Sequence, residues 1–107
     1  MIRCSMLEKH IQSQILAYLR LKGVFHWRQN TGAVNIQGKN GNRFVRFGKP
    51  GISDIIGIYN GRFLAIEVKT QKGRLSEHQK VFLKDVEDNG GIAIVARSVE
   101  DVIKGLG

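Results

Sequence analysis

Two carboxylates and one ammonium lie close together in the stretch GISDIIGIYNGRFLAIEVK, residues 51–69. Two runs rich in β-branched residues flank Asn60-Gly61, a pair that strongly favours a two-residue hairpin turn. If these two residues form the turn, the numbers of each cross-strand pair sum to 121. Asp54 then faces Glu67, with Cβ atoms about 5 Å apart. Lys69 lies two residues beyond Glu67 and therefore on the same face of the strand.

Two ionised carboxylates at this separation repel each other by about 3 kcal/mol at an effective dielectric constant near 20. A folded protein relieves this repulsion by moving one carboxylate, raising its pKa, or placing a cation between the two. Mg²⁺ is typically held by one or two carboxylates together with substrate phosphates. The set therefore predicts a metal-assisted centre for phosphodiester hydrolysis, in which the Lys69 ammonium positions a water or stabilises charge on a phosphate. The alternative interpretation is that all three side chains are solvated and bind nothing.

These motifs resemble a known nuclease family. Asp54, followed by Glu67-Val68-Lys69 at the end of an apolar strand, resembles the PD-(D/E)xK nuclease superfamily. More narrowly, the residues GISD at 51–54, the run EVKTQKGRLSEHQ and an acid on the first predicted helix resemble the VRR-NUC (virus-type replication-repair nuclease) domain. The resemblance extends from the helix near Glu8 to the strand near Ile94. Asp54 follows Ser53 instead of the proline of the superfamily's name, which leaves the carboxylate in place.

The resemblance implies a PD-(D/E)xK nuclease-like α/β core and a metal-dependent endonuclease acting on DNA. Asp54 and Glu67 would ligate Mg²⁺ or Mn²⁺, with the Val68 carbonyl and Glu8 as further ligands, and Gln79 would orient a water or a phosphate. Glu8 also has a simpler role open to it, because a carboxylate near a helix N-terminus is electrostatically favoured. Small stand-alone members of phage or bacterial type resemble homodimeric resolvases that cut branched DNA such as Holliday junctions.

The composition limits the class of protein. A single domain covering residues 1–107 is expected, with a core of modest size. The net charge of +8, from 17 Lys and Arg against 9 Asp and Glu, predicts a polyanionic partner. The single Cys4 excludes an intramolecular disulfide. We expect no contact with a membrane and an intracellular, cytoplasmic location, because the sequence has neither a long apolar run nor a signal-peptide region.

The competing functional class is a non-catalytic nucleic-acid-binding module, or a subunit that recruits other nucleases. In that case the positive charge binds DNA and the acids are structural. Such a module would bind without metal and would not cleave.

The first residues are predicted to form a helix over 6–22, ended by a glycine, and then a strand over 24–28. Trp27, on that strand, is interpreted as a core or flanking residue, with stacking on a nucleic-acid base as the alternative.

The segment 30–50 is rich in glycine and is expected to form loops, interrupted by a strand over 43–47. Basic residues in this segment and in the turn after Lys69 are expected to contact DNA phosphates. They are Lys39, Arg43, Arg46, Lys49, Lys72 and Arg74. The alternative is a solvated edge strand whose charges prevent aggregation.

Ser76 begins a predicted helix that runs to about residue 88, and Ser76-x-x-Gln79 matches a capping box. Gln79 thus has two competing roles, in the cap and in the site, which one amide in one rotamer is not expected to fill together. We favour the site. The apolar run at 92–96 is typical of a buried strand after a helical crossover, and a short helix follows to about residue 105. The order predicts a mixed sheet, an antiparallel meander plus one crossover strand, flanked by helices on both faces.

Overall fold

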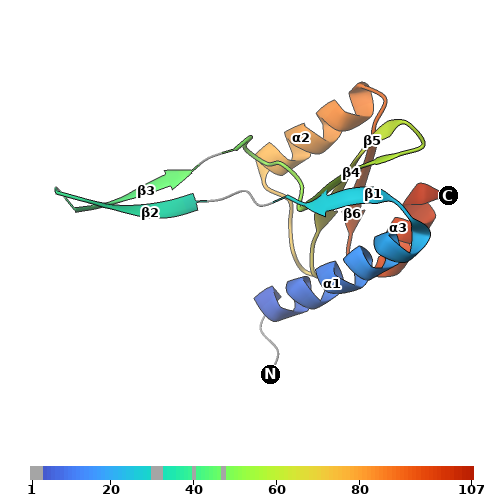
Figure 1. Cartoon of the computed structure of the whole chain (residues 1–107), viewed down its shortest axis with the longest axis horizontal. Helices are drawn as coiled ribbons and strands as arrows, with labels where there is room; N and C mark the ends of the chain where they lie inside the picture. Colours follow the sequence, from blue (N-terminus) through green and yellow to red (C-terminus); the bar gives the residue numbers. More distant parts are fainter. Residues whose placement is uncertain (1–3, 30–32, 40, 47) are drawn as a thin grey trace.

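The computed structural model describes residues 4–29, 33–39, 41–46 and 48–107, with side chains described at 7–29, 37–39, 41 and 48–107. A four-stranded mixed sheet carries helices on both faces, and a separate two-stranded hairpin extends away from it (Figure 1). The predicted α/β fold class is therefore confirmed. Within the described residues, no helix is both long and apolar enough to cross a membrane.

The main sheet has the strand order β1-β4-β5-β6. β1 (Phe25–Arg28), β4 (Ile55–Tyr59) and β5 (Arg62–Val68) pair antiparallel and form the predicted meander. β6 (Ile92–Ala96) is parallel to β5 and is the predicted crossover strand. A parallel pair cannot be joined by a tight turn, and α2 (Glu77–Asp88) supplies the crossover between these two strands.

Asn60 and Gly61 form the tight turn between β4 and β5. Their φ angles are 50° and 76°, in the left-handed region that glycine adopts freely and asparagine tolerates. Tyr59 pairs with Arg62, and the ladder continues without slippage to the last pair, Ile55 with Ile66. The register predicted from the turn is confirmed. The next position of this ladder brings Asp54 beside Glu67.

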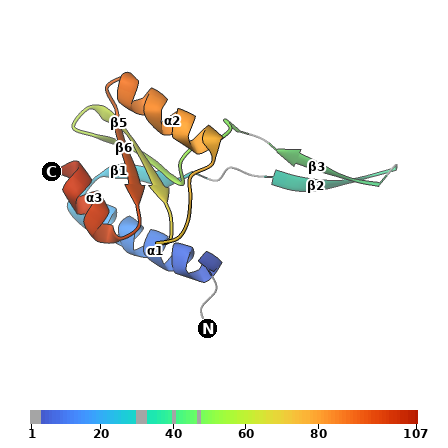
Figure 2. The same cartoon turned by 180° about the vertical axis from the view of Figure 1, so that it is seen from behind.

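Two hydrophobic cores lie on opposite faces of the sheet, beneath the helices that cover the two faces (Figure 2). On one face, α1 (Cys4–Lys22) and α3 (Val99–Leu106) cover the even-numbered residues of β5, Leu64, Ile66 and Val68. On the other face, α2 covers Ala65 together with Ile56 of β4. Because side chains alternate along a strand, Glu67 shares the face of Ala65 and points toward α2.

The hairpin of β2 (Ala33–Gly38) and β3 (Gly41–Arg46) forms its own two-stranded sheet. It accounts for a radius of gyration of 15.2 Å, above the value of about 13 Å typical of a compact chain of this length. The strand expected over 43–47 exists as β3, but the expectation of loop over 33–38 is wrong. Val34 and Ile36 alternate with polar residues, a strand pattern that the high glycine content of the segment masked.

Candidate active site

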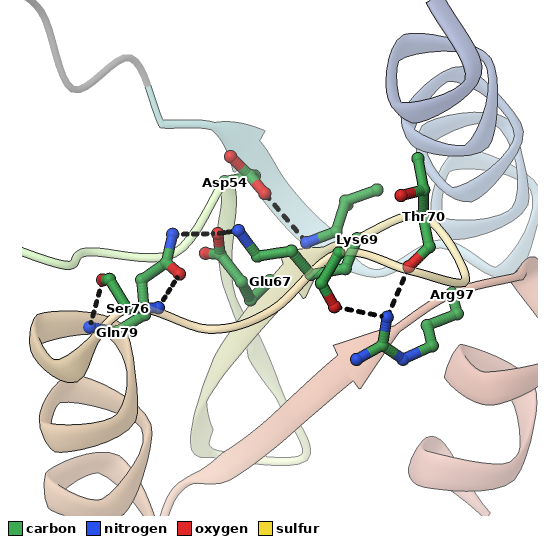
Figure 3. Close-up of polar contacts among 9 residues, drawn as sticks. Asp54, Glu67, Lys69, Thr70, Ser76, Gln79 and Arg97 are labelled. Atoms are coloured by element: carbon green, nitrogen blue, oxygen red, sulfur yellow. Dashed lines mark hydrogen bonds and ion pairs between the residues drawn. The ribbon is translucent and has the colours of Figure 1, made fainter. Parts of the chain in front are cut away.

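Asp54 accepts hydrogen bonds from backbone groups at the ends of the two neighbouring strands. Its carboxylate oxygen Oδ2 accepts a hydrogen bond from the Val68 backbone N–H at 2.8 Å (Figure 3). Its backbone carbonyl accepts another from the N–H of Gln29, just beyond β1, at 2.7 Å. The position of this carboxylate is thus fixed by backbone groups at the ends of β1 and β5.

Glu67 is almost fully buried, with only 3% of its surface exposed. Its oxygen Oε1 accepts a hydrogen bond from Gln79 Nε2 at 2.7 Å, and the Lys69 ammonium lies 3.9 Å from the same oxygen (Figure 3). The second oxygen, Oε2, is also buried and has no hydrogen-bond partner among the described residues. An unpaired buried carboxylate oxygen is costly, so a cation at this position would be stabilised.

Burial raises the pKa of both carboxyl groups. At Glu67 burial is the largest cause and the negative charge of Asp54 adds to it, so the pKa rises to about 8 in spite of the Lys69 ammonium. Burial also raises the pKa of Asp54, against the opposing effects of the Val68 N–H and the Lys69 charge. Glu67 therefore retains its proton at neutral pH when no cation is bound.

Gln79, in the first turn of α2, contacts both the helix cap and the carboxylate pair. Its carbonyl Oε1 accepts a hydrogen bond from the Ser76 N–H at 2.8 Å, while Ser76 Oγ accepts one from the Gln79 N–H at 3.2 Å, completing the capping box. Its Nε2 donates to Glu67. Contrary to expectation, one rotamer makes both contacts, because the amide has an acceptor at one end and two donors at the other. The role of Gln79 in orienting a water or a phosphate stays a prediction.

Lys69 lies at the start of a loop that hydrogen bonds hold in place. Its backbone N–H donates to the Ala96 carbonyl at 2.9 Å, which ties the end of β5 to β6. In the loop that follows, Arg97 Nη1 donates to the carbonyls of Thr70, Gln71 and Gly73. Figure 3 shows the contact of Arg97 with Thr70. Arg97 was not among the predicted residues. It lies just beyond the end of β6, the neighbour of β5, and no local spacing in the sequence indicates that contact.

Gly51 is a second residue that the sequence analysis assigned no role. Its φ is +75°, and a Cβ placed there would lie only 2.2 Å from the His78 carbonyl oxygen and 2.7 Å from the Gln79 nitrogen. The loop that leads into Asp54 therefore touches the backbone of α2 at its first turn. Only glycine permits this contact, which sets the distance between Asp54 and the helix that carries Gln79.

Glu8 lies on α1 and is half-buried. Among the described residues, no group of three or more His, Cys, Asp or Glu side chains is gathered so as to hold a metal ion. The structure thus brings Asp54, Glu67, Lys69 and Gln79 together but does not bring Glu8 into a cluster with the two carboxylates. The support of the site by Glu8 stays a prediction.

The predicted DNA contacts belong to three segments. Lys39, at the end of the β2–β3 hairpin, and Lys49, which precedes Gly51, are exposed. Lys72 and Arg74 are exposed in the loop between β5 and α2. Arg43 and Arg46 belong to β3, and their side chains lie outside the described residues. The role of each of these residues in DNA binding stays a prediction.

The carboxylate pair fits a hard divalent cation. Such ions take oxygen ligands, and here two acids converge from neighbouring strands with one buried oxygen unpaired. Burial is the largest cause of the raised pKa of each carboxyl group, and at Glu67 the charge of Asp54 adds to it. The Val68 carbonyl remains a predicted further ligand.

A comparison with curated proteins gave no match. A comparison with protein families, however, matched residues 6–100 to the VRR-NUC domain. This domain has a PD-(D/E)xK-like fold, it is a nuclease domain with DNA as the implied substrate, and nucleases of this kind generally use divalent metals. Because the match covers nearly the whole chain, the protein belongs to the VRR-NUC nuclease domain family.

Proposed function

We propose that this protein is a Mg²⁺- or Mn²⁺-dependent endodeoxyribonuclease formed by one VRR-NUC domain over residues 1–107. The observation that supports it best is the buried pair of Asp54 and Glu67, in which Glu67 Oε2 has no partner among the described residues. When bound, a divalent cation would neutralise the pair and stabilise negative charge on the phosphate under attack. Asp54 and Glu67 would hold it, with the Val68 carbonyl and Glu8 in support.

Lys69 and Gln79 are proposed to act on the water and the phosphate. The Lys69 ammonium lies beside Glu67, where it can favour a deprotonated water or stabilise charge on the phosphate in the transition state. Gln79 has a second amide proton besides the one donated to Glu67, and this proton is available to orient a water or a phosphate oxygen. Both residues are fixed by backbone contacts, which reduces the reorganisation needed during reaction.

The preferred substrate is proposed to be branched DNA, such as a Holliday junction, bound by a homodimer. This part rests on analogy with small relatives of resolvase type and on the limited surface of one small domain. The six basic residues Lys39, Arg43, Arg46, Lys49, Lys72 and Arg74 are proposed to contact phosphates. The net charge of +8 supports such binding.

Cleavage of a labelled four-way junction, a flap and a plain duplex, each with Mg²⁺, Mn²⁺ or EDTA, tests the proposal. We expect metal-dependent cutting that Asp54→Ala and Lys69→Ala abolish. Asp88→Ala and Lys84→Ala are matched controls, because this ion pair is exposed near the end of α2 remote from Gln79, and both should cut normally. Binding without cutting in either metal would leave a non-catalytic DNA-binding module, and light scattering would test the dimer.

A further inference from the structure

α2 covers only part of one face of the main sheet, and the part of this face that stays open is apolar and aromatic. α2 packs over β5 and β6, and it leaves the β1 side of this face open. Four large side chains there are 43–63% exposed. They are Phe25, Trp27, Ile58 and Phe63. A continuous exposed apolar patch of this kind on a soluble fold usually marks a binding surface.

Strand register places this patch directly beside the carboxylate pair. Trp27 pairs with Ile56, which pairs with Ala65, so the three form one row across the sheet. Asp54 and Glu67 occupy the next row on the same face, two residues along each strand. Trp27 is therefore diagonal to Asp54, a relation that separates Cβ atoms by about 7–8 Å.

Two contacts hold the Trp27 ring in place. Its indole Nε1–H donates to the side-chain oxygen of Gln29 at 2.9 Å, and the Gln29 backbone in turn donates to the carbonyl of Asp54. The ring of Phe25 packs against it edge to face, with centroids 5.6 Å apart. An aromatic ring that is fixed but 43% exposed can receive a stacking partner without losing much side-chain entropy.

The charge of the chain favours a polyanionic partner for the patch. Residues 9–53 contain eight Lys and Arg and no Asp or Glu. Lys49 lines a hollow with Phe63 at the far end of the patch, together with Asp85 of α2. Arg28 follows Trp27 on the edge strand and, by alternation, belongs to the opposite face of the sheet. Exposed aromatic side chains on a basic protein are typical of surfaces that bind single-stranded nucleic acid, in which bases stack on the rings.

We propose that Trp27 stacks on an unpaired base of the DNA substrate, adjacent to the phosphate held over Asp54 and Glu67. In a plain duplex each base is already stacked between its neighbours, so this contact selects DNA with an unpaired nucleotide, as at a branch or a flap. The inference rests on the proposed nuclease function and adds to it a residue that determines which DNA structure is bound.

Trp27 is the only tryptophan in the chain, so its fluorescence reports the contact directly. The wild-type protein in EDTA would be titrated with an oligothymidylate and with a blunt duplex of equal length, at one low salt concentration. We expect saturable quenching by the oligothymidylate and much less by the duplex. This readout needs neither metal nor cleavage. Quenching without cleavage in any metal would support the stacking site while removing the nuclease proposal, and cleavage without quenching would remove only the stacking site.

Binding of the same labelled oligothymidylate by variants, followed by anisotropy, gives the second measurement. Trp27→Ala should weaken binding about 5- to 150-fold, the equivalent of one stacked base, and Trp27→Phe should retain most of the affinity. Leu21→Ala is the matched control, because Leu21 is a large apolar residue exposed on α1. Equal affinity of Trp27→Ala and wild type would overturn the proposal. So would a fluorescence spectrum that shifts with protein concentration in the absence of DNA, since a second copy would then cover the patch.

Discussion

Replacing Glu67 by glutamine should remove a pH dependence of stability from the metal-free protein. The pKa of Glu67 is about 8 in the folded state, against an ordinary value of 4.5. Between these values the unfolded chain has lost the proton and the folded chain retains it, so stability falls as pH rises from about 4.5 to about 8. The difference of about 3.5 in pKa sets an upper limit of about 5 kcal/mol on this loss.

Urea unfolding in EDTA at pH 5 and pH 9 measures the effect. At pH 5 the wild type and Glu67→Gln should be similarly stable, because both side chains are neutral and both offer an oxygen to Gln79. At pH 9 the wild type should be less stable than the variant by about 2–5 kcal/mol. Glu87→Gln is the matched control, since Glu87 is exposed near the end of α2, and it should behave as wild type at both pH values.

Added metal should reverse the loss. Mn²⁺ at pH 9 should stabilise the wild type, because the ion binds the folded state with both carboxylates ionised, and should stabilise Glu67→Gln much less. The reasoning would be refuted by parallel pH profiles of wild type and variant in EDTA. That result would mean that water reaches Glu67 Oε2 freely and that the pair is not buried in solution.

Three further changes follow from the contacts around the site. Gly51→Ala should lower the free energy of unfolding, measured in urea, by at least about 1 kcal/mol from the positive φ alone. It should also lower kcat more than the loss of folded protein explains, because the new Cβ displaces the helix turn that carries Gln79. Ser53→Ala should leave the unfolding free energy unchanged or raise it by up to about 1 kcal/mol, because the buried Ser53 hydroxyl has no partner among the described residues. Arg97→Ala should lower the free energy of unfolding by about 1.5–3 kcal/mol, measured by heat or urea, and should lower kcat, because it releases the loop after Lys69. An unchanged kcat would show that the position of this loop does not affect catalysis.

The sequence predicted the parts of the site that local backbone rules determine. Asn60-Gly61 selects one turn geometry, and the turn fixes the register, so Asp54 and Glu67 could be placed together from spacing alone. Period-two alternation then placed Lys69 on the same face. These inferences require no knowledge of distant segments, which is why they hold.

Such local rules could not predict contacts between residues that are far apart in the sequence. Arg97 reaches the loop at Gly73, 24 residues earlier in the chain, and Gly51 touches α2 at a point set by the packing of the helix on the sheet. Neither contact has a periodic pattern in the sequence. Strand β2 of the β2–β3 hairpin was not predicted for a different reason. The glycine content of the segment was given more weight than its short alternation of apolar and polar residues.

Gln79 shows that the start of α2 and the carboxylate pair form one hydrogen-bonded unit. The cap fixes the Gln79 side chain through Ser76, and the same side chain holds Glu67 Oε1. Lys69 approaches that oxygen as well, so within the described part of the chain Oε1 has two partners and Oε2 has no hydrogen-bond partner. A cation that coordinates Oε2 therefore needs to displace a proton but no protein hydrogen bond to Oε1. The orientation of Glu67 is set before any ion arrives, and the local stability of the first turn of α2 is then a condition for catalysis.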